Sequence, residues 1–467
     1  MSAIITPDKD DFRDRITTVE DDGSRKWIFA KKPKGPFYNK RTIASILYLV
    51  IFFGLPWIQL EGEPLFMLNV IERKFIIFGL HFGVQDLIVF GLAMLTGVVF
   101  IVLFTVVFGR LFCGWACPQT IFMEMVFRKV EYWIEGDMQQ QRALSKSEWT
   151  SQKITKRVLK YVVFFILSFL IANTFLSYII GLPELKKIIT EPISQHVIGF
   201  FAIILFTGAF FAVYAFLREQ ICIVACPYGR LQGVMLDKDS IVVAYDYVRG
   251  EPRGKVSKDA EVKHGDCIDC KACVHVCPTG IDIRNGTQLE CINCTACIDA
   301  CDDIMIKIDK PKGLIRYASD NNISKGTKLK FSTRIAAYST VLVLLLALLT
   351  YTFVSHSVVD ASILRTPGQF YQENPDGTIS NLYNFKVANK KNKTMNIKFL
   401  LDHQAGSIKI IGHEQIAIPA GEEHQGQLFI IMPQQVKMEK NQKLKIKLYD
   451  HDKEIETIST TFMAPVN

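Results

Sequence analysis

Twelve cysteines carry most of the chemistry that this sequence can perform, and all of them lie between Cys113 and Cys301. Eight of them form two runs of the spacing C-x2-C-x2-C-x3-C, one beginning at Cys267 and the other at Cys291. In bacterial ferredoxins this spacing binds two [4Fe–4S] clusters, and the fourth cysteine of each run ligates the other cluster. The expected ligand sets are Cys267, Cys270, Cys273 and Cys301 for one cluster, and Cys277, Cys291, Cys294 and Cys297 for the other.

Zinc is the alternative occupant of these cysteines, because C-x2-C pairs also bind zinc. Eight cysteines in a doubled run favour iron–sulfur clusters instead. Pro278 follows the first run, whereas Asp302 stands at the corresponding place of the second. That departure concerns the local turn and leaves the number of ligands unchanged.

The remaining cysteines form two matching motifs, Cys113-Gly-Trp-Ala-Cys117-Pro118 and Cys222-Ile-Val-Ala-Cys226-Pro227. An arginine precedes each motif by a few residues. Within one helix, a spacing of four places both sulfurs on one face. Each proline indicates instead that a new helix starts there, the first leading into an amphipathic helix at Gln119–Ile134.

Four thiolates at one membrane face suit a soft metal ion, and copper(I) is the natural candidate. Thiol–disulfide exchange is a second interpretation, although redox pairs usually have the closer C-x-x-C spacing. A third is that the four cysteines pack as small hydrophobic residues. Two copies of the motif at equivalent places, beside an iron–sulfur module, favour a metal or redox role.

Long apolar segments must position these cysteines at a membrane. Hydrophobic residues make up 49% of the 467 residues, and charged residues make up 21%. Disorder, a collagen-like structure and a small secreted disulfide scaffold are excluded by this composition. A spanning helix needs about 20 apolar residues, and five segments qualify: 42–60, 87–109, 161–183, 192–217 and 335–359. Phe75–Gln85 is too short to cross and is expected to lie at the interface or to re-enter.

Lysine and arginine residues near the segment ends predict the orientation. They are concentrated in the N-terminal tail 1–41, in the 110–160 loop and in the 218–334 region, which are therefore expected to be cytoplasmic. An odd number of spans then sends the C-terminus to the outer side. The net charge of +8 is explained by this topology, so no nucleic-acid partner is expected. His81, His196 and His356 near the outer face are interpreted as interfacial rather than as haem or quinone ligands.

Residues 360–467 contain short runs of alternating polar and apolar residues, separated by turn residues. This pattern predicts an all-β sandwich. The expected strands are Met395–Leu401, Ser407–Ile411, Gln427–Met432, Lys443–Tyr449 and Glu454–Phe462. The absence of cysteine from this region suits an oxidising compartment.

Taken together, these features resemble the FixG/CcoG family, the cytochrome c oxidase accessory proteins of bacteria. The resemblance covers nearly the whole chain. The segments that carry it are Gly109–Gln119 (GRLFCGWACPQ), Cys222–Arg230 (CIVACPYGR), Cys291–Asp302 (CINCTACIDACD), Gly313–Tyr317 (GLIRY), Arg365–Gly368 and Asn381–Tyr383.

The resemblance implies a multi-domain membrane protein of the bacterial inner membrane. It has a five-span α-helical domain, an inserted cytoplasmic two-[4Fe–4S] ferredoxin domain at 218–334, and a C-terminal periplasmic immunoglobulin-like β sandwich. It also implies reduction of copper(II) to copper(I) for assembly of a cbb-type oxidase, with oxidase subunits or copper chaperones as partners. Under this interpretation, the catalytic and copper-binding thiols are those of Cys113, Cys117, Cys222 and Cys226.

Two alternatives remain open from the sequence. The chain also resembles membrane ferredoxins that oxidise quinol, although the long β domain and the lack of histidines in the middle of the spans disfavour this. The second alternative is a scaffold without enzymatic activity that holds oxidase subunits through its β domain. The electron donor is not predicted by either.

Overall fold

The computed structural model describes residues 17–464, apart from 21, 61, 71–73, 79, 84–85, 255–263, 327–332, 356–358, 369–370, 392, 403–404, 413–415, 435–440 and 452. The chain divides into two compact units. The first consists of Met1–Gly54, Leu92–Ser177 and Pro183–Ala347, and contains every cysteine. The second consists of Leu55–Gly91, Tyr178–Leu182 and Leu348–Asn467.

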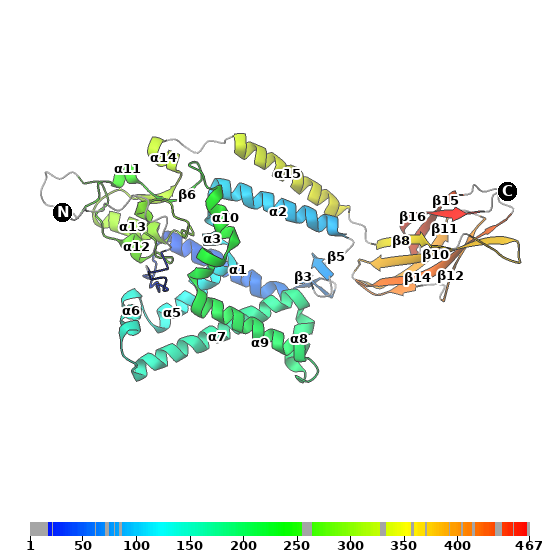
Figure 1. The fold of residues 1–467 in the computed structure, drawn as a ribbon, viewed down its shortest axis with the longest axis horizontal. Coiled ribbons are helices and arrows are strands. Elements are labelled where there is room, and N and C mark those ends of the chain that lie inside the picture. The colour runs from blue at the N-terminus through cyan, green and yellow to red at the C-terminus, as the bar shows by residue number, and fades with distance from the viewer. Residues whose placement is uncertain are drawn as a thin grey trace. The chain divides into compact units, whose positions relative to one another are not determined.

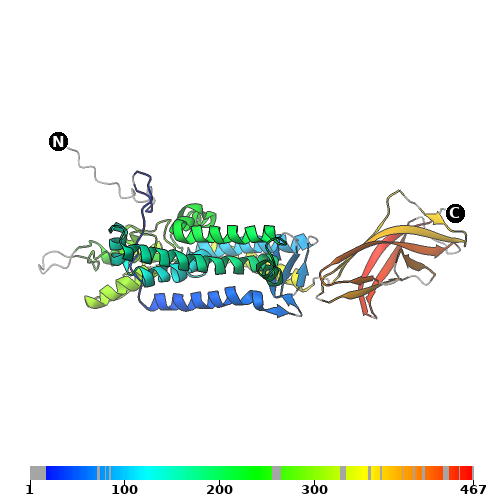
Figure 2. The same cartoon turned by 90° about the horizontal axis from the view of Figure 1, so that it is seen from below.

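Five helices in the described part of the chain are long and apolar enough to cross a membrane. They are α1 (Pro36–Gly54), α2 (Leu87–Phe108), α7 (Ser151–Ile180), α9 (Val197–Ala212) and α15 (Thr333–Val354). Figure 2 shows α1 in blue, α7 in teal and α9 in green, each extended along the unit, and Figure 1 shows that α7 crosses α9 at an angle. None of the apolar window of α15 is buried in protein, as a lipid-facing helix allows. Each of the five predicted spans therefore coincides with a helix.

The ends of these helices differ from the predicted spans. Helix α1 begins six residues earlier than predicted, at Pro36, because proline is favoured in the first helical turn. It gives way to a 3-10 turn at Leu55–Trp57, which contains Pro56. Helix α7 begins at Ser151, so the end of the predicted 110–160 loop is helical. Helix α15 ends at Val354, and Val359 already belongs to a strand.

Part of the predicted N-terminal tail packs on folded elements. The Thr17 hydroxyl donates to the Thr279 carbonyl at 3.1 Å, and the Lys31 amide donates to the His275 carbonyl at 2.7 Å. Arg25 forms a 3.0 Å ion pair with Glu219. The described residues before α1 are thus attached to the cysteine-rich region.

Between the 3-10 turn and α2, the second unit contains two small sheets. A hairpin pairs β1 (Gln59–Leu60) with β2 (Glu63–Pro64). A three-stranded antiparallel sheet has the order β3 (Phe66–Asn69), β4 (Lys74–Ile77) and β5 (Leu80–Phe82). The described residues of Phe75–Gln85 therefore belong largely to strands β4 and β5 and form no spanning helix, as expected from their length. His81 is buried in β5, His196 lies 2.6 Å from a Glu191 carboxylate oxygen, and His356 lies outside the described residues.

The cysteine-rich region of the first unit folds around two short helices, α12 (Ala272–His275) and α13 (Ala296–Lys307). An antiparallel pair of strands, β6 (Val242–Tyr245) and β7 (Ile315–Ala318), packs in the same core. Figure 1 shows these elements at one end of the helices of this unit. Shorter helices complete it: α3 (Leu111–Trp115), α4 (Pro118–Thr120), α5 (Arg128–Ile134), α6 (Met138–Lys146), α8 (Leu182–Thr190), α10 (Pro227–Met235), α11 (Tyr247–Gly250) and α14 (Asp320–Lys325).

The C-terminal part of the second unit is a sandwich of two antiparallel sheets. One has the order β12 (Ser407–Ile410), β14 (Glu423–Pro433), β10 (Thr378–Asn389) and β8 (Val359–Arg365), with β9 (Gln372–Glu373) paired to β10. The other has the order β13 (Ile416–Ile418), β11 (Met395–Leu401), β15 (Asn441–Asp450) and β16 (Lys453–Met463). Alternate side chains of both sheets, including Tyr383 of β10 and Ile446 of β15, fill one core. The predicted sandwich is confirmed, and all five predicted strands are present.

Candidate redox site

The first thiol motif lies where α2 turns into a short helix. Gly109 makes this turn with φ +54°, and a Cβ there would come within 2.7 Å of the Ile241 carbonyl. Cys113 lies in α3, whereas Cys117 is the residue before α4, with Pro118 in its first turn. The helix start expected at the proline is therefore confirmed.

The second motif repeats this arrangement. A π-helical segment, Val213–Leu217, extends α9 and ends at Arg218, whose φ is +52°. Another π-helical segment, Ile221–Ala225, carries Cys222. Cys226 precedes α10, which has Pro227 in its first turn. Each motif thus places one sulfur in a short helix and the other at the start of the next.

The helix that follows the first motif is part of the protein core. Residues 118–134 are helical throughout, as α4, the π-helical segment Ile121–Phe127 and α5. Buried side chains point to several sides of this segment and include Met123, Met125 and Glu131. The prediction of an amphipathic helix was therefore wrong in one respect: this helix is enclosed rather than half exposed.

The thiols of the two motifs are neighbours, although the motifs are far apart in the sequence. Burial raises the pKa of Cys113 to about 12, and the nearby Cys117 and Cys226 thiols add to this effect, while Arg110 opposes it. Burial also raises the pKa of Cys222 to about 12, with further contributions from Cys117, Cys113 and Cys226. The structure thus brings together the four cysteines of the two motifs, which the sequence relates only through their common C-x3-C-P pattern.

The side chain of Gln232 in α10 connects the two motifs. The Cys113 thiol donates to Gln232 Oε1 at 3.1 Å, and Arg110 Nε donates to the same oxygen at 3.2 Å. Gln232 is fully buried. In the described part of the chain, no three cysteine, histidine or acidic side chains converge on one metal-ion position. The four thiols are nevertheless close neighbours across the two motifs.

The eight other cysteines surround two neighbouring cavities. One is lined by Cys267, Cys270, Cys273 and Cys301. The other is lined by Cys277, Cys291, Cys294 and Cys297, with Cys273 also at its edge. These groupings are the two crossed ligand sets expected from the spacing. Two separate sets of four thiols, each around its own apolar cavity, fit two cubane clusters.

The two cysteine runs have the same backbone conformation. Asp269 and Lys271 of the first run have φ near +51° and +57°, and Asn293 and Thr295 of the second have φ near +52° and +66°. Such left-handed conformations are uncommon outside glycine, so their repetition identifies a duplicated loop. Burial raises the pKa of the Cys291 thiol to about 12, and a hydrogen bond from the Asn293 amide opposes this effect. A bound metal replaces that proton.

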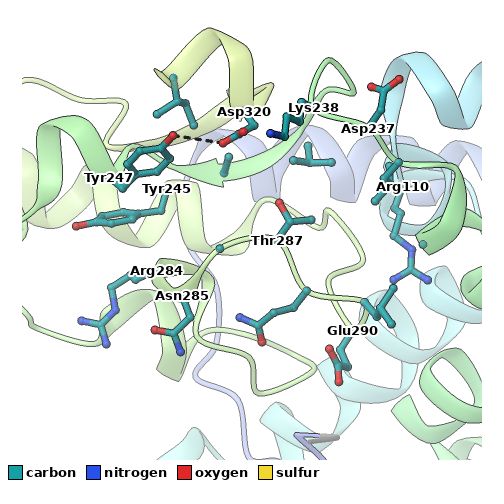
Figure 3. A pocket seen from close by; sticks show the side chains of 18 of the residues that line it. Arg110, Asp237, Lys238, Tyr245, Tyr247, Arg284, Asn285, Thr287, Glu290 and Asp320 are labelled. Atoms are coloured by element: carbon teal, nitrogen blue, oxygen red, sulfur yellow. Dashed lines mark hydrogen bonds between the residues drawn. The ribbon is translucent and has the colours of Figure 1, made fainter. Parts of the chain in front are cut away.

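A cavity of about 890 Å³ is lined by Tyr245 of β6, by Arg284 and by Glu290, the residue before Cys291 (Figure 3). The Tyr245 ring lines it, and burial raises the pKa of this tyrosine, with the neighbouring Cys267 thiol adding to the effect. Tyr247 donates to Asp320 Oδ1 at 3.3 Å on the same wall. The charged residues around it carry both signs and comprise Arg110, Lys238, Arg284, Asp237, Glu251, Glu290 and Asp320. This cavity therefore has no strong preference for an anionic ligand.

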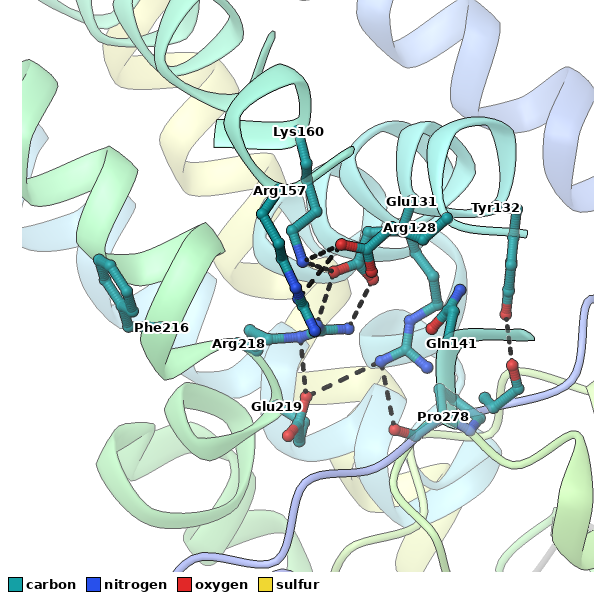
Figure 4. Close-up of polar contacts among 12 residues, drawn as sticks. Arg128, Glu131, Tyr132, Gln141, Arg157, Lys160, Phe216, Arg218, Glu219 and Pro278 are labelled. Atoms are coloured by element: carbon teal, nitrogen blue, oxygen red, sulfur yellow. Dashed lines mark hydrogen bonds and ion pairs between the residues drawn. The ribbon is translucent and has the colours of Figure 1, made fainter. Parts of the chain in front are cut away.

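A buried ion-pair network joins the membrane helices to the cysteine-rich region (Figure 4). Arg218 donates to both carboxylate oxygens of Glu131, at 2.7 and 2.9 Å. Lys160 lies 2.9 Å from a Glu135 oxygen, and Arg128 Nη2 donates to the Pro278 carbonyl at 3.5 Å. Burial acts to raise the pKa of Glu131, but Arg218, followed by Lys160 and Arg128, holds it below its usual value.

Sequence reasoning did not identify these buried partners. Arg128 and Lys160 counted only as signals of orientation, because nothing local in the sequence pairs them with glutamates. Arg110 and Arg218 were noticed as residues preceding the motifs, yet their roles differ. Arg110 bonds to Gln232 beside the thiols, whereas Arg218 belongs to the ion-pair network.

Three family models match this chain. Residues 217–320 match one described as a 4Fe-4S dicluster domain, and residues 90–138 match one described as a 4Fe-4S binding domain. Residues 349–465 match the immunoglobulin-like fold at the C-terminus of FixG. These matches cover both the cysteine-rich region and the β sandwich.

Relatives of known name align over most of the chain. Protein RdxA of Cereibacter sphaeroides is 33% identical over 87% of this chain and 89% of its own length. Nitrogen fixation protein FixG of Rhizobium meliloti is 35% identical over 67% of this chain and 61% of its own length. The solved structure of a FixG-related protein from Vibrio parahaemolyticus covers 24% of this chain and 99% of that chain, at 17% identity and a TM-score of 0.20.

Proposed function

We propose that this chain, which belongs to the FixG family of membrane-bound iron–sulfur proteins, reduces copper(II) to copper(I) at the four thiols of its two C-x3-C-P motifs. We call these four the membrane thiols. The observation that supports this most is the gathering of Cys113, Cys117, Cys222 and Cys226 beside the duplicated cysteine runs. Copper(I) is the natural ion for such a thiolate site, because soft sulfur ligands favour the reduced, softer ion. When bound, the two [4Fe–4S] clusters supply single electrons.

The protein residues contribute binding and exclusion of water. The half-buried thiols of both motifs would bind copper, and Gln232 accepts a hydrogen bond from the Cys113 thiol. Copper has to displace protons held by burial, so binding is coupled to proton release.

The delivery of copper(I) to a cbb-type oxidase is part of this proposal. The electrons come from a cytoplasmic donor or from quinol. The partner that receives copper(I) is an oxidase subunit or a copper chaperone. The positive-inside rule supports a cytoplasmic placement of the clusters and an outer placement of the β sandwich. The bacterial inner membrane and the periplasm are implied by the family. Labelling of single introduced cysteines by membrane-impermeant reagents in intact cells would test this orientation.

A third iron–sulfur cluster on the four membrane thiols is the second candidate. One observation favours it: residues 90–138, which contain Cys113 and Cys117, match a model described as a 4Fe-4S binding domain. Four cysteines are also the usual number of ligands for such a cluster. Iron analysis separates the two candidates.

Serine at Cys113, Cys117, Cys222 and Cys226 together is expected to abolish copper binding and copper(II) reduction, because the soft ligands are lost. Iron, sulfide and cluster absorbance of the anaerobically purified variant are expected to equal those of the unaltered chain. Met125→Leu is the matched control, because it removes a buried sulfur from the adjoining core without touching either motif.

Two outcomes would contradict the copper proposal. Undiminished copper binding and reduction in the fourfold variant would show that these thiols are not the site. A fall in iron and sulfide by about one cluster equivalent would assign the thiols to a third iron–sulfur cluster instead.

A further inference from the structure

The first thiol motif packs directly on the loop of the second cysteine run. A Cβ on Gly114 would lie 2.6 Å from the Ile292 carbonyl oxygen and 2.7 Å from the Asn293 carbonyl oxygen. No side chain fits at that distance, so the two backbones approach as closely as glycine permits. We call this contact, made by Gly114, Ile292 and Asn293, the junction.

Two buried arginines hold the junction together. Arg110 Nη1 donates to the Cys291 carbonyl at 3.3 Å, while Arg110 Nε shares the Gln232 acceptor used by the Cys113 thiol. Arg41 Nε donates to the Gly114 carbonyl at 2.7 Å. A single guanidinium at Arg110 therefore connects a membrane thiol with a cluster-ligating residue.

Further contacts fix the second run against the membrane helices. The Asp299 carboxylate accepts hydrogen bonds from the Phe37 amide at 3.2 Å and the Tyr38 amide at 2.8 Å, which caps the start of α1. Trp115 Nε1 donates to the Tyr317 hydroxyl at 3.0 Å, and that hydroxyl donates to the Asn293 carbonyl at 3.5 Å. The junction is thus braced on several sides.

The first cysteine run has no equivalent connection to the thiols. Within the described residues, no hydrogen bond joins either thiol motif to the run Cys267–Cys277. Other segments contact this region: the Lys31 amide bonds to the His275 carbonyl, and Arg128 bonds to the carbonyl of Pro278, the residue after the run. The two ligand sets therefore differ in their relation to the membrane thiols.

We propose that the junction makes Cys277, Cys291, Cys294 and Cys297 the ligand set that exchanges electrons with copper on the membrane thiols, with Arg41, Arg110 and Gly114 as positioning residues. This inference rests on the function proposed above. Copper(II) would gain one electron and become copper(I), balanced by the one-electron oxidation of the reduced [4Fe–4S] cluster that the second ligand set would hold. Electron tunnelling slows steeply with distance, so the closer set exchanges faster.

Single-cluster variants test the order of transfer. Cys270→Ser removes a ligand of the first set only, and Cys294→Ser removes a ligand of the second set only. After anaerobic reduction and mixing with copper(II), the Cys270→Ser variant is expected to keep the rapid oxidation of its remaining cluster, and the Cys294→Ser variant is expected to lose it. Equal rates, or a faster Cys294→Ser variant, would overturn the inference. No copper reduction even by the unaltered chain would overturn the proposed function instead.

A second measurement does not depend on copper. Gly114→Ala forces the Ile292–Asn293 backbone to move, so it is expected to change the electron paramagnetic resonance spectrum and midpoint potential of the cluster kept in Cys270→Ser. The cluster kept in Cys294→Ser is expected to stay unchanged. Gly208→Ala in α9 is the matched control, because a Cβ there meets nothing within 4 Å. If the single-cluster variants do not fold, Gly114→Ala and Gly208→Ala are compared in the chain that keeps both clusters. Gly114→Ala must then alter the electron paramagnetic resonance signal of one cluster. Two unaltered signals would overturn the inference.

Discussion

The substitution Cys301→Ser is expected to remove the cluster held mainly by the first cysteine run, although Cys301 is the last cysteine of the second run. The reason is the crossed lining of the two cavities, which places Cys301 with Cys267, Cys270 and Cys273. Iron and sulfide of the anaerobically purified variant are expected to fall to about half, because one of two [4Fe–4S] clusters is lost.

Double variants identify which cluster is missing. Adding Cys270→Ser to Cys301→Ser is expected to cause no further loss of iron, because both residues belong to the same set. Adding Cys294→Ser to Cys301→Ser is expected to remove nearly all of the iron. The reverse pattern would show that each run binds its own cluster and that the ligands are not crossed.

The second large effect is expected from Arg218→Met, which leaves the Glu131 carboxylate buried without its bidentate partner. Both side chains are 3% exposed. Removing one member of a buried pair costs about 3–5 kcal/mol, and Glu131 would keep only the longer contact with Lys160 at 3.7 Å and the field of Arg128. Thermal and urea unfolding of the detergent-solubilised chain would measure this loss.

Two further variants make that test specific. Lys187→Met breaks an exposed ion pair with Glu184 and is expected to cost about 0.5 kcal/mol or less. Combining Arg218→Met with Glu131→Leu is expected to recover part of the loss, because no unpaired carboxylate then remains. An Arg218→Met variant as stable as the Lys187→Met control would show that the network contributes little to stability.

Strand prediction succeeded where polar and apolar residues alternate clearly. Met395–Leu401 was predicted with the bounds of β11. Strand β10 was not predicted, because its asparagines interrupt the alternation of polar and apolar residues in the sequence. In the structure, Tyr383, Phe385 and Val387 are nevertheless buried at every second position. Strand β8 was partly absorbed into the predicted fifth span, since its first residue continues an apolar stretch.

Local information also explains which parts of the redox site were predictable. Ligand spacing, apolar segment length and the position of proline after cysteine act over a few residues, so the sequence by itself determined the two cluster runs, the five spans and the helix starts after Cys117 and Cys226. Its periodicity also determined that the last hundred or so residues form a β sandwich.

Only the tertiary structure decided how these parts meet. Helix packing brings Cys113 beside Cys226, pairs Arg218 with Glu131, and presses Gly114 onto the second cysteine run rather than the first. Such contacts join residues far apart in the chain, and they depend on shape and on the satisfaction of buried charge. The spacing of the twelve cysteines therefore predicts redox chemistry, whereas the packing of the helices decides which cysteines lie close enough to exchange electrons.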